Sequence, residues 1–174
     1  MIAYLSRYDL IVVGGGHAGC EAALAAARMG CRVLLMAIDL DKIAAMPCSP
    51  SIGGMAKGQL VREVDALGGE MAKITDRTAI QYKMLNTKKG PAVQSSRTQN
   101  DKQRYHMAMK AVLERQPNLY VKQALVENLV VENNRVVGVE DNTGYGYQAG
   151  AVLLATGTFL SGLVHIGFKS IKSG

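Results

Sequence analysis

Residues 9–36 read DLIVVGGGHAGCEAALAAARMGCRVLLM and decide the fold. The stretch opens with a short apolar run, Asp9–Val13, which ends at glycines and is typical of a buried parallel strand. The alanine-rich segment Ala18–Met29 contains no proline and stops at Gly30, as a helix does. Arg32–Met36 is a second apolar run. Strand, helix and strand in so short a space predict one right-handed βαβ unit.

The turn between the first strand and the helix fits the pattern G-x-G-x-x-G. Its residues are Gly14, Gly15, Gly16, His17, Ala18 and Gly19. In this pattern Gly14 permits the tight turn, Gly16 lets the backbone approach a pyrophosphate, and Gly19 lets helix and strand pack closely. The phosphates would bind the amides of the helix N-terminus. Such a turn alone is common, but here a strand precedes it and a helix and second strand follow, so the sequence predicts dinucleotide binding.

One part of the dinucleotide fingerprint is missing. An acidic residue that binds the ribose is expected at the end of the second strand, near Met36 or Ala37. Neither side chain can accept a hydrogen bond from a hydroxyl. Asp39 comes slightly later and could substitute for the missing acid.

The second half of the chain changes to strand periodicity. Residues 119–147 are β-rich, with a turn at Asn133-Asn134, and lead into Ala151–Ala155, which we expect to be another buried strand ending at Thr156 and Gly157. This order resembles the glutathione-reductase-like class of FAD domains, in which a β-meander leads to a strand with an A-T-G-like turn near the cofactor. The fold class expected is therefore α/β, a Rossmann-like FAD-binding domain with a β-meander.

The middle of the chain is expected to alternate loops and helices. Residues 46–58 are rich in Pro, Ser and Gly and predict an ordered loop. Gln59–Leu67 predicts a short helix that stops at Gly68-Gly69, and Asp101–Arg115 predicts a longer one closed by Pro117.

Composition excludes several classes of protein. The chain is 48% hydrophobic and 20% charged, which is ordinary for a globular protein, and no apolar run is long enough for a membrane span or a signal peptide. Three cysteines without a C-x-x-C pair make a disulfide scaffold or a metal site improbable. We therefore expect a cytoplasmic protein with no metal.

The net charge of +6 is concentrated between residues 83 and 110. That segment holds seven basic residues against the single acid Asp101, and the rest of the chain balances. The seven are Lys83, Lys88, Lys89, Arg97, Lys102, Arg104 and Lys110. Such a stripe suits a polyanion; a solvated helix face is the alternative.

Several segments together carry a resemblance to one family. They are Gly14–Ala23 (GGGHAGCEAA), Pro47–Gly58 (PCSPSIGGMAKG), Val64–Gly69 (VDALGG), Leu85–Val93 (LNTKKGPAV) with Arg97 soon after, and Gly157–Leu160 (GTFL). In this order the segments resemble the MnmG family, also called GidA, over essentially the whole chain. Members of that family are several times longer, so residues 1–174 are expected to be the N-terminal part of an FAD-binding domain, apparently truncated. The NADH-binding insertion and the C-terminal helical domain would be absent.

The resemblance implies an activity. Enzymes of the family add the carboxymethylaminomethyl or aminomethyl group at C5 of the wobble uridine of certain tRNAs. FAD is the cofactor, NADH and 5,10-methylenetetrahydrofolate are co-substrates, and the family works as a homodimer with an MnmE-type GTPase. The 174 residues alone are expected to be inactive.

The resemblance also assigns roles to residues. Cys48 matches a family cysteine and is the candidate nucleophile. The alternatives are that Cys48 is a buried structural thiol, or that a second family cysteine beyond this chain is the nucleophile. Val126 is expected to contact FAD through its backbone near the adenine. Lys88, Lys89 and Arg97 flank the Gly90-Pro91 loop and are candidates for nucleic-acid binding.

The sequence is also compatible with other functions. The chain could be a different FAD-dependent oxidoreductase or a related folate-dependent tRNA methyltransferase. It could also be a truncated, non-catalytic module that binds only nucleotide or RNA.

Overall fold

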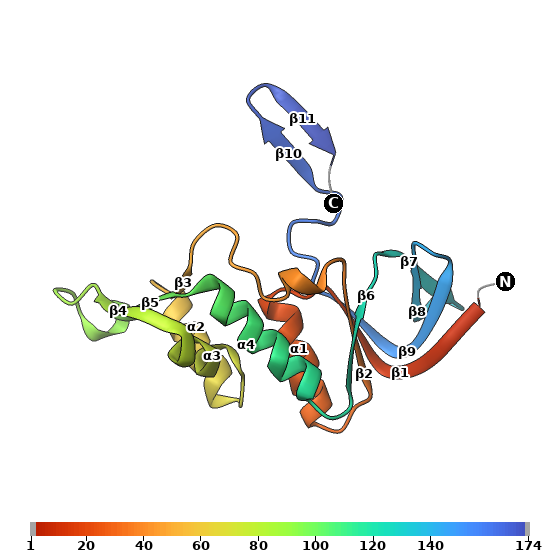
Figure 1. Cartoon of the computed structure of the whole chain (residues 1–174), viewed down its shortest axis with the longest axis horizontal. Helices are drawn as coiled ribbons and strands as arrows, with labels where there is room; N and C mark the ends of the chain where they lie inside the picture. The colour runs from red at the N-terminus through yellow and green to blue at the C-terminus, as the bar shows by residue number, and fades with distance from the viewer. Residues whose placement is uncertain (1–2, 173–174) are drawn as a thin grey trace.

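A six-stranded sheet forms one end of the molecule in the computed structural model, which describes residues 3–172 (Figure 1). β1 (Ala3–Val13), α1 (His17–Arg28) and β2 (Val33–Ala37) make up a βαβ unit in which β1 and β2 are parallel. The helix ends at Gly30, which has φ of +92° and donates its N–H to the Ala27 carbonyl at 3.0 Å. The predicted βαβ unit is confirmed.

The rest of this sheet comes from the second half of the chain. Its strands are β6 (Leu119–Gln123), β7 (Val126–Glu132), β8 (Arg135–Asp141) and β9 (Tyr145–Leu154). The strand order is β6-β2-β1-β9-β8-β7. β6, β2, β1 and β9 are parallel, whereas β7, β8 and β9 form an antiparallel meander. The α/β fold class with a Rossmann-like sheet and a β-meander is therefore confirmed.

A smaller lobe lies beside the large sheet. It contains the antiparallel sheet β3-β5-β4 and two helices. The elements are β3 (Ser51–Gly53), α2 (Lys57–Ala66), α3 (Met71–Thr78), β4 (Ala79–Leu85) and β5 (Ser95–Asn100). Figure 1 shows the β4–β5 hairpin extending away from the large sheet. The prediction of α2 is confirmed, but the prediction that residues 46–58 form only a loop is wrong, because β3 pairs with β5 within that stretch.

The helix α4 (Lys102–Arg115) lies across the junction of the two parts (Figure 1). It begins where the sequence predicts, since the Asp101 carboxylate accepts hydrogen bonds from two first-turn amides at 3.0 Å. The remaining elements are two 3₁₀ turns and one β-hairpin. They are η1 (Leu40–Lys42), η2 (Pro91–Val93), β10 (Leu163–Ile166) and β11 (Lys169–Lys172).

The two faces of the large sheet are buried by different elements. On one face, Leu24 of α1 and Tyr105, Met109 and Leu113 of α4 are fully buried against the strands. On the other face, the buried cluster includes Met36 and side chains of the meander. Burial of apolar surface on both faces fixes where the strand ends lie.

The expectation that Ala151–Ala155 is a buried strand is wrong in one respect. These residues do continue β9 and pair with β1, but Leu153 is 36% exposed and Leu154 is 48% exposed. The backbone of this segment pairs with β1, while residues 3–172 cover the two leucine side chains only in part. An apolar run therefore identified the strand correctly but not its burial.

The two parts of the molecule are tied together by charged groups on α1. The Glu21 carboxylate accepts hydrogen bonds from the amides of Glu70, at 2.9 Å, and Met71. These amides open α3, which has no cap from its own N-cap side chain. Arg28 donates to the Gly68 carbonyl at 2.7 Å and pairs with Glu70 at 2.6 Å. The Glu21 carboxylate thus caps the N-terminus of α3.

Removing the Glu21 carboxylate is expected to destabilise the protein. In Glu21→Ala, two part-buried amides lose their acceptor, and we expect the free energy of unfolding to fall by about 1–3 kcal/mol. Glu21→Gln keeps one acceptor oxygen and should lose less. Urea unfolding followed by circular dichroism measures both, with the exposed Glu63→Ala as control. Equal stability of Glu21→Ala and Glu63→Ala would show that the α3 amides do not depend on this contact.

Candidate functional site

The glycine turn between β1 and α1 is anchored to its neighbours through the backbone. Gly14 has φ of +115°, and its N–H donates to the Met36 carbonyl at 2.8 Å. The carbonyl of Gly15 accepts a hydrogen bond from the Ala44 amide at 2.8 Å. The turn therefore lies at the carboxyl ends of the parallel strands, where nucleotides bind in α/β sheets.

Two of the glycines are required by packing alone. A Cβ on Gly14 would overlap the carbonyl of Ala155, and a Cβ on Gly19 would overlap the carbonyl of Gly14. Gly15 is also tight, because its Cβ would lie 3.0 Å from the Cβ of Ala37. These close approaches bring α1, β1 and the residues after β9 together at one point.

Gly16 differs from the other glycines of the turn. Apart from its two chain neighbours, no heavy atom of residues 3–172 would lie within 4 Å of a Cβ there, so the space above it is open. Gly16 is the N-cap of α1, and no described side chain caps that helix. The first-turn amides, those of His17, Ala18 and Gly19, lack acceptors one turn back in their own helix and carry the positive end of its dipole. This arrangement suits a pyrophosphate.

The segment after β9 meets the glycine turn, as the A-T-G resemblance predicted. The amide of Ala155 donates to the Val13 carbonyl at 2.8 Å, and its own carbonyl lies against Gly14. Thr156 and Gly157 follow directly, so they stand beside the turn. The structure thus brings together two groups of predicted site residues from opposite ends of the chain.

Val126 lies at the start of β7, the outer strand of the meander. It opens β7 and pairs with Asp141 of β8. The link before it is fixed next to β2, since the Ala124 amide donates to the Ala37 carbonyl at 2.9 Å. Contact of Val126 with an adenine is compatible with this place and stays a prediction.

His17 contributes a neutral ring beneath the turn. Its ring lies 5.6 Å from the ring of Tyr105 on α4, and neither His17 Nε2 nor the Tyr105 hydroxyl has a hydrogen-bond partner among the described residues. Burial lowers the pKa of His17, so the ring carries no charge near neutral pH. The positive field at the turn therefore comes from backbone amides.

The three cysteines are in different environments. Cys20 is buried, its thiol donates to the Gly15 carbonyl at 3.4 Å, and burial raises its pKa to about 12. Cys31 is partly buried, whereas Cys48 is exposed in the loop between η1 and β3. The alternative that Cys48 is a buried structural thiol is wrong. Among the three thiols, Cys48 is the one that a substrate can reach most freely.

This difference predicts selective alkylation. With iodoacetamide at pH 8, Cys48 of the native protein should react at least about ten times faster than Cys20, because a thiol of pKa about 12 is ionised to roughly one part in ten thousand at that pH. Peptide mass mapping over time measures both rates. In urea the two rates should converge. Comparable native rates would mean that Cys20 is not enclosed by the fold.

The predicted basic stripe is divided between two elements. Lys83 and Arg97 are paired across β4 and β5, and Lys88 and Lys89 lie in the loop of that hairpin, while the remaining members lie on α4. Lys88, Lys89 and Arg97 are exposed and form no ion pair within residues 3–172. The alternative, that the basic stripe is one solvated helix face, is therefore wrong.

Two members of the stripe make contacts that hold the fold. Arg97 donates to the Ser51 hydroxyl at 3.1 Å, and so it also holds β3. Lys110 pairs with Asp41 at 2.9 Å, which joins α4 to η1. Arg97 and Lys110 therefore make contacts within the fold, whereas Lys88 and Lys89 at the hairpin tip form no ion pair within residues 3–172.

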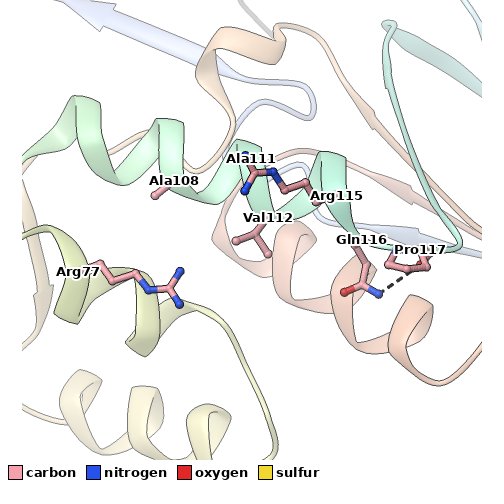
Figure 2. Close-up of a pocket in the computed structure, with 7 residues that line it drawn as sticks. All are labelled: Arg77, Ala108, Ala111, Val112, Arg115, Gln116 and Pro117. Atoms are coloured by element: carbon pink, nitrogen blue, oxygen red, sulfur yellow. Dashed lines mark hydrogen bonds between the residues drawn. The ribbon is translucent and has the colours of Figure 1, made fainter.

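A separate hollow of about 350 Å³ lies between α3 and the end of α4 (Figure 2). Its lining consists of Arg77, Ala108, Ala111, Val112, Arg115, Gln116 and Pro117. None of these is a predicted site residue, and the Gln116 amide is engaged with the Pro117 carbonyl at 3.3 Å. The hollow therefore does not coincide with the glycine turn.

Two further findings concern the described residues 3–172. They contain no group of three or more His, Cys, Asp or Glu side chains that could hold a metal ion. In the same range, no helix has both the length and the apolar character needed to cross a membrane.

Sequence reasoning missed Glu21 as the cap of α3 and Tyr105 as the neighbour of His17. Both contacts join residues far apart in the chain, and no local motif marks them. An aromatic residue in an otherwise polar segment of α4 was the single available signal for Tyr105.

Comparison with known proteins places this geometry in a family. Residues 9–174 match the sequence model of the family described as "Glucose inhibited division protein A". The tRNA uridine 5-carboxymethylaminomethyl modification enzyme MnmG of Syntrophobacter fumaroxidans is 66% identical over 170 residues, 98% of this chain and 26% of that protein. The enzyme of the same name from Geotalea uraniireducens is 60% identical over the whole chain, which spans 28% of its length.

A solved structure agrees with these sequences. Aquifex aeolicus GidA, in its form II crystal, is 57% identical and superimposes with a TM-score of 0.90 over 95% of this chain and 27% of that one. The chain thus spans about a quarter of the length of the relatives that it matches. Because the family model covers nearly all residues and the fold agrees, the chain belongs to the glucose inhibited division protein A family, the family also called GidA or MnmG.

Proposed function

We propose that residues 1–174 are the N-terminal portion of an FAD-binding domain. The observation that carries the proposal is the open space above Gly16, at a helix N-terminus that no side chain of residues 3–172 caps. A pyrophosphate fits there because donors are free and no side chain intrudes. Gly14 to Gly19, Thr156 and Gly157 would hold the phosphates, and the Val126 backbone would meet the adenine. When bound, FAD supplies hydride and electron transfer.

The whole protein, of which the chain would be one part, is proposed to modify the wobble uridine of certain tRNAs. The support is that two relatives, at 66% and 60% identity, are tRNA uridine 5-carboxymethylaminomethyl modification enzymes. Family membership further suggests NADH and 5,10-methylenetetrahydrofolate as co-substrates. It also suggests a homodimer and an MnmE-type GTPase as partner, in the cytoplasm. The 174 residues alone would bind cofactor without completing the reaction.

Cys48 is proposed as a nucleophile towards the uracil ring. C5 of uracil is a poor nucleophile, and addition of a thiolate to C6 places the electron pair of the C5–C6 double bond on C5 and O4. After C5 has formed its new bond and lost its proton, elimination restores the double bond and releases the thiolate. Exposure of Cys48 in a loop supports this role.

Lys88 and Lys89 are proposed to contact the tRNA backbone, with Arg97 at the base of the same hairpin. Their exposure and freedom from ion pairs within residues 3–172 support this assignment. Phosphate contacts of this kind would position the tRNA without reading its sequence.

The test of cofactor binding is an absorbance spectrum of the purified chain after FAD is added and excess is removed. A retained flavin band with a protein-perturbed shape is the expected result. A band that elutes entirely with the free cofactor would mean that these residues do not hold FAD. The role of Cys48 is tested separately, in the full-length protein. If the chain retains flavin but Cys48→Ala leaves the rate of tRNA modification unchanged, the thiolate role is excluded.

A further inference from the structure

The end of β2 cannot supply a polar side chain to a nucleotide. Met36 is 1% exposed and lies in the cluster beneath the meander, while Ala37 is 6% exposed. Ala37 lies on the other face of the strand, the face of the glycine turn, because a Cβ on Gly15 would approach its Cβ at 3.0 Å. The place where an acid usually binds the ribose is therefore filled by a methyl group.

The neighbouring strand offers a polar group at this same place. β6 runs parallel to β2, and Gln123, its last residue, is the register partner of Ala37. Alternation along β6 puts Gln123 on the face of Leu119 and Val121, which pack against the cluster shared with α1. Ala37 occupies the corresponding face of β2. The two side chains are thus lateral neighbours, about 5 Å apart at the strand spacing.

Gln123 is also exposed, and the backbone next to it is fixed. Its side chain is solvent-accessible, whereas the next residue is fixed by the 2.9 Å hydrogen bond from the Ala124 amide to the Ala37 carbonyl. Lys122, on the opposite face, lies over the Tyr147 ring at 5.1 Å. A carboxamide at a fixed backbone position can accept from one ribose hydroxyl and donate to another.

Asp39, the residue named from the sequence as a substitute, already has a structural role. Its carboxylate accepts from the Asp41 amide at 2.8 Å and so caps η1. The next turn is held in addition by the pair between Asp41 and Lys110. Asp39 is therefore oriented along its own backbone, two residues beyond the end of β2.

We infer that Gln123 binds the ribose hydroxyls of the adenosine half of the dinucleotide, replacing the acid that is absent from β2. The inference rests on the proposed function, since it requires a nucleotide on the glycine turn. The third parallel strand, rather than the second, then determines recognition of the ribose.

The experiment compares ADP with 2′,3′-dideoxy-ADP by isothermal titration calorimetry on the whole chain. Wild type should bind ADP about tenfold more tightly than the dideoxy compound, which corresponds to one or two hydrogen bonds. Gln123→Ala should weaken ADP and FAD binding about tenfold and leave dideoxy-ADP unchanged. Gln123→Glu, which restores a carboxylate acceptor, should keep the preference for the ribose.

Two controls separate the possible failures. Gln148→Ala changes an exposed glutamine in the same sheet, opposite Arg7 of β1 and away from the glycine turn, and should have no effect. Asp39→Asn keeps a capping side chain and should keep the tenfold preference. If Gln123→Ala retains that preference, the inference is wrong while the nucleotide site stands. If wild type binds neither ADP nor FAD, the proposed function itself fails.

Discussion

Gly16→Asp is expected to abolish FAD binding and to leave the fold intact. The new side chain would enter open space and leave the packing undisturbed, since apart from the chain neighbours no heavy atom of residues 3–172 lies within 4 Å of a Cβ there. The carboxylate would occupy the place of the pyrophosphate, repel it and cap the helix amides that should bind it. Loss of two or more charge-assisted hydrogen bonds weakens binding by about 100-fold or more.

Flavin fluorescence titration measures this affinity, and thermal unfolding without cofactor checks the fold. Gly90→Asp is the matched control, because Gly90 also has open space around its Cβ and lies in the β4–β5 loop. That variant should bind FAD like wild type. If Gly16→Asp retained wild-type affinity, the pyrophosphate would have to lie elsewhere.

Gly19→Ala, in contrast, should lower the stability of the fold whether or not cofactor is present. At an open position inside a helix this change stabilises by up to about 1 kcal/mol. At Gly19 the methyl group would overlap the carbonyl of Gly14, and backbone cannot give way as a flexible side chain can. We expect the free energy of unfolding to fall by about 3 kcal/mol or more as α1 is pushed away from β1.

Denaturant unfolding of the apo protein tests this expectation. Ala25→Val adds bulk at an exposed position of the same helix and should cost less than about 1 kcal/mol. Similar midpoints for Gly19→Ala and Ala25→Val would show that α1 can move away from the turn at little cost. The pair Gly16 and Gly19 thus separates binding from folding within one motif.

The βαβ unit could be predicted from sequence because its signals are local. An apolar run, a glycine turn and an alanine-rich helix that stops at Gly30 each act over a few residues. The same holds for the Asp101 cap and for the turn at Asn133-Asn134, where both asparagines have positive φ. In each case the residue type carries the conformation itself.

β5 could not be predicted, because its buried face is polar. Thr98 and Asn100 are buried on that face while Gln99 between them is exposed, so an alternation is present there but invisible to hydropathy. Their hydrogen bonds explain their burial: Thr98 donates to the Asn100 side chain at 2.9 Å, which in turn donates to the Thr75 carbonyl at 2.9 Å. A network of this kind depends on α3, far away in the chain.

The candidate site, like the fold, could be predicted from the sequence only in part. Spacing of the glycines indicated the pyrophosphate turn, and the resemblance added Thr156 and Gly157. The neighbour of Ala37 on β6 could not be found in that way, because register between distant strands leaves no trace in a single sequence. The sequence predicted that Leu153 and Leu154 are buried, because an apolar run does not reveal whether other residues pack against it.

The contact between Gly14 and Ala155 has a consequence for biosynthesis. During translation the glycine turn leaves the ribosome early, but the strand that completes it is made near the end of the described residues. Until then β1 keeps one unpaired edge, and this long-range pairing slows folding. The proposed cofactor site is therefore complete only after β9 has been synthesised and has paired with β1.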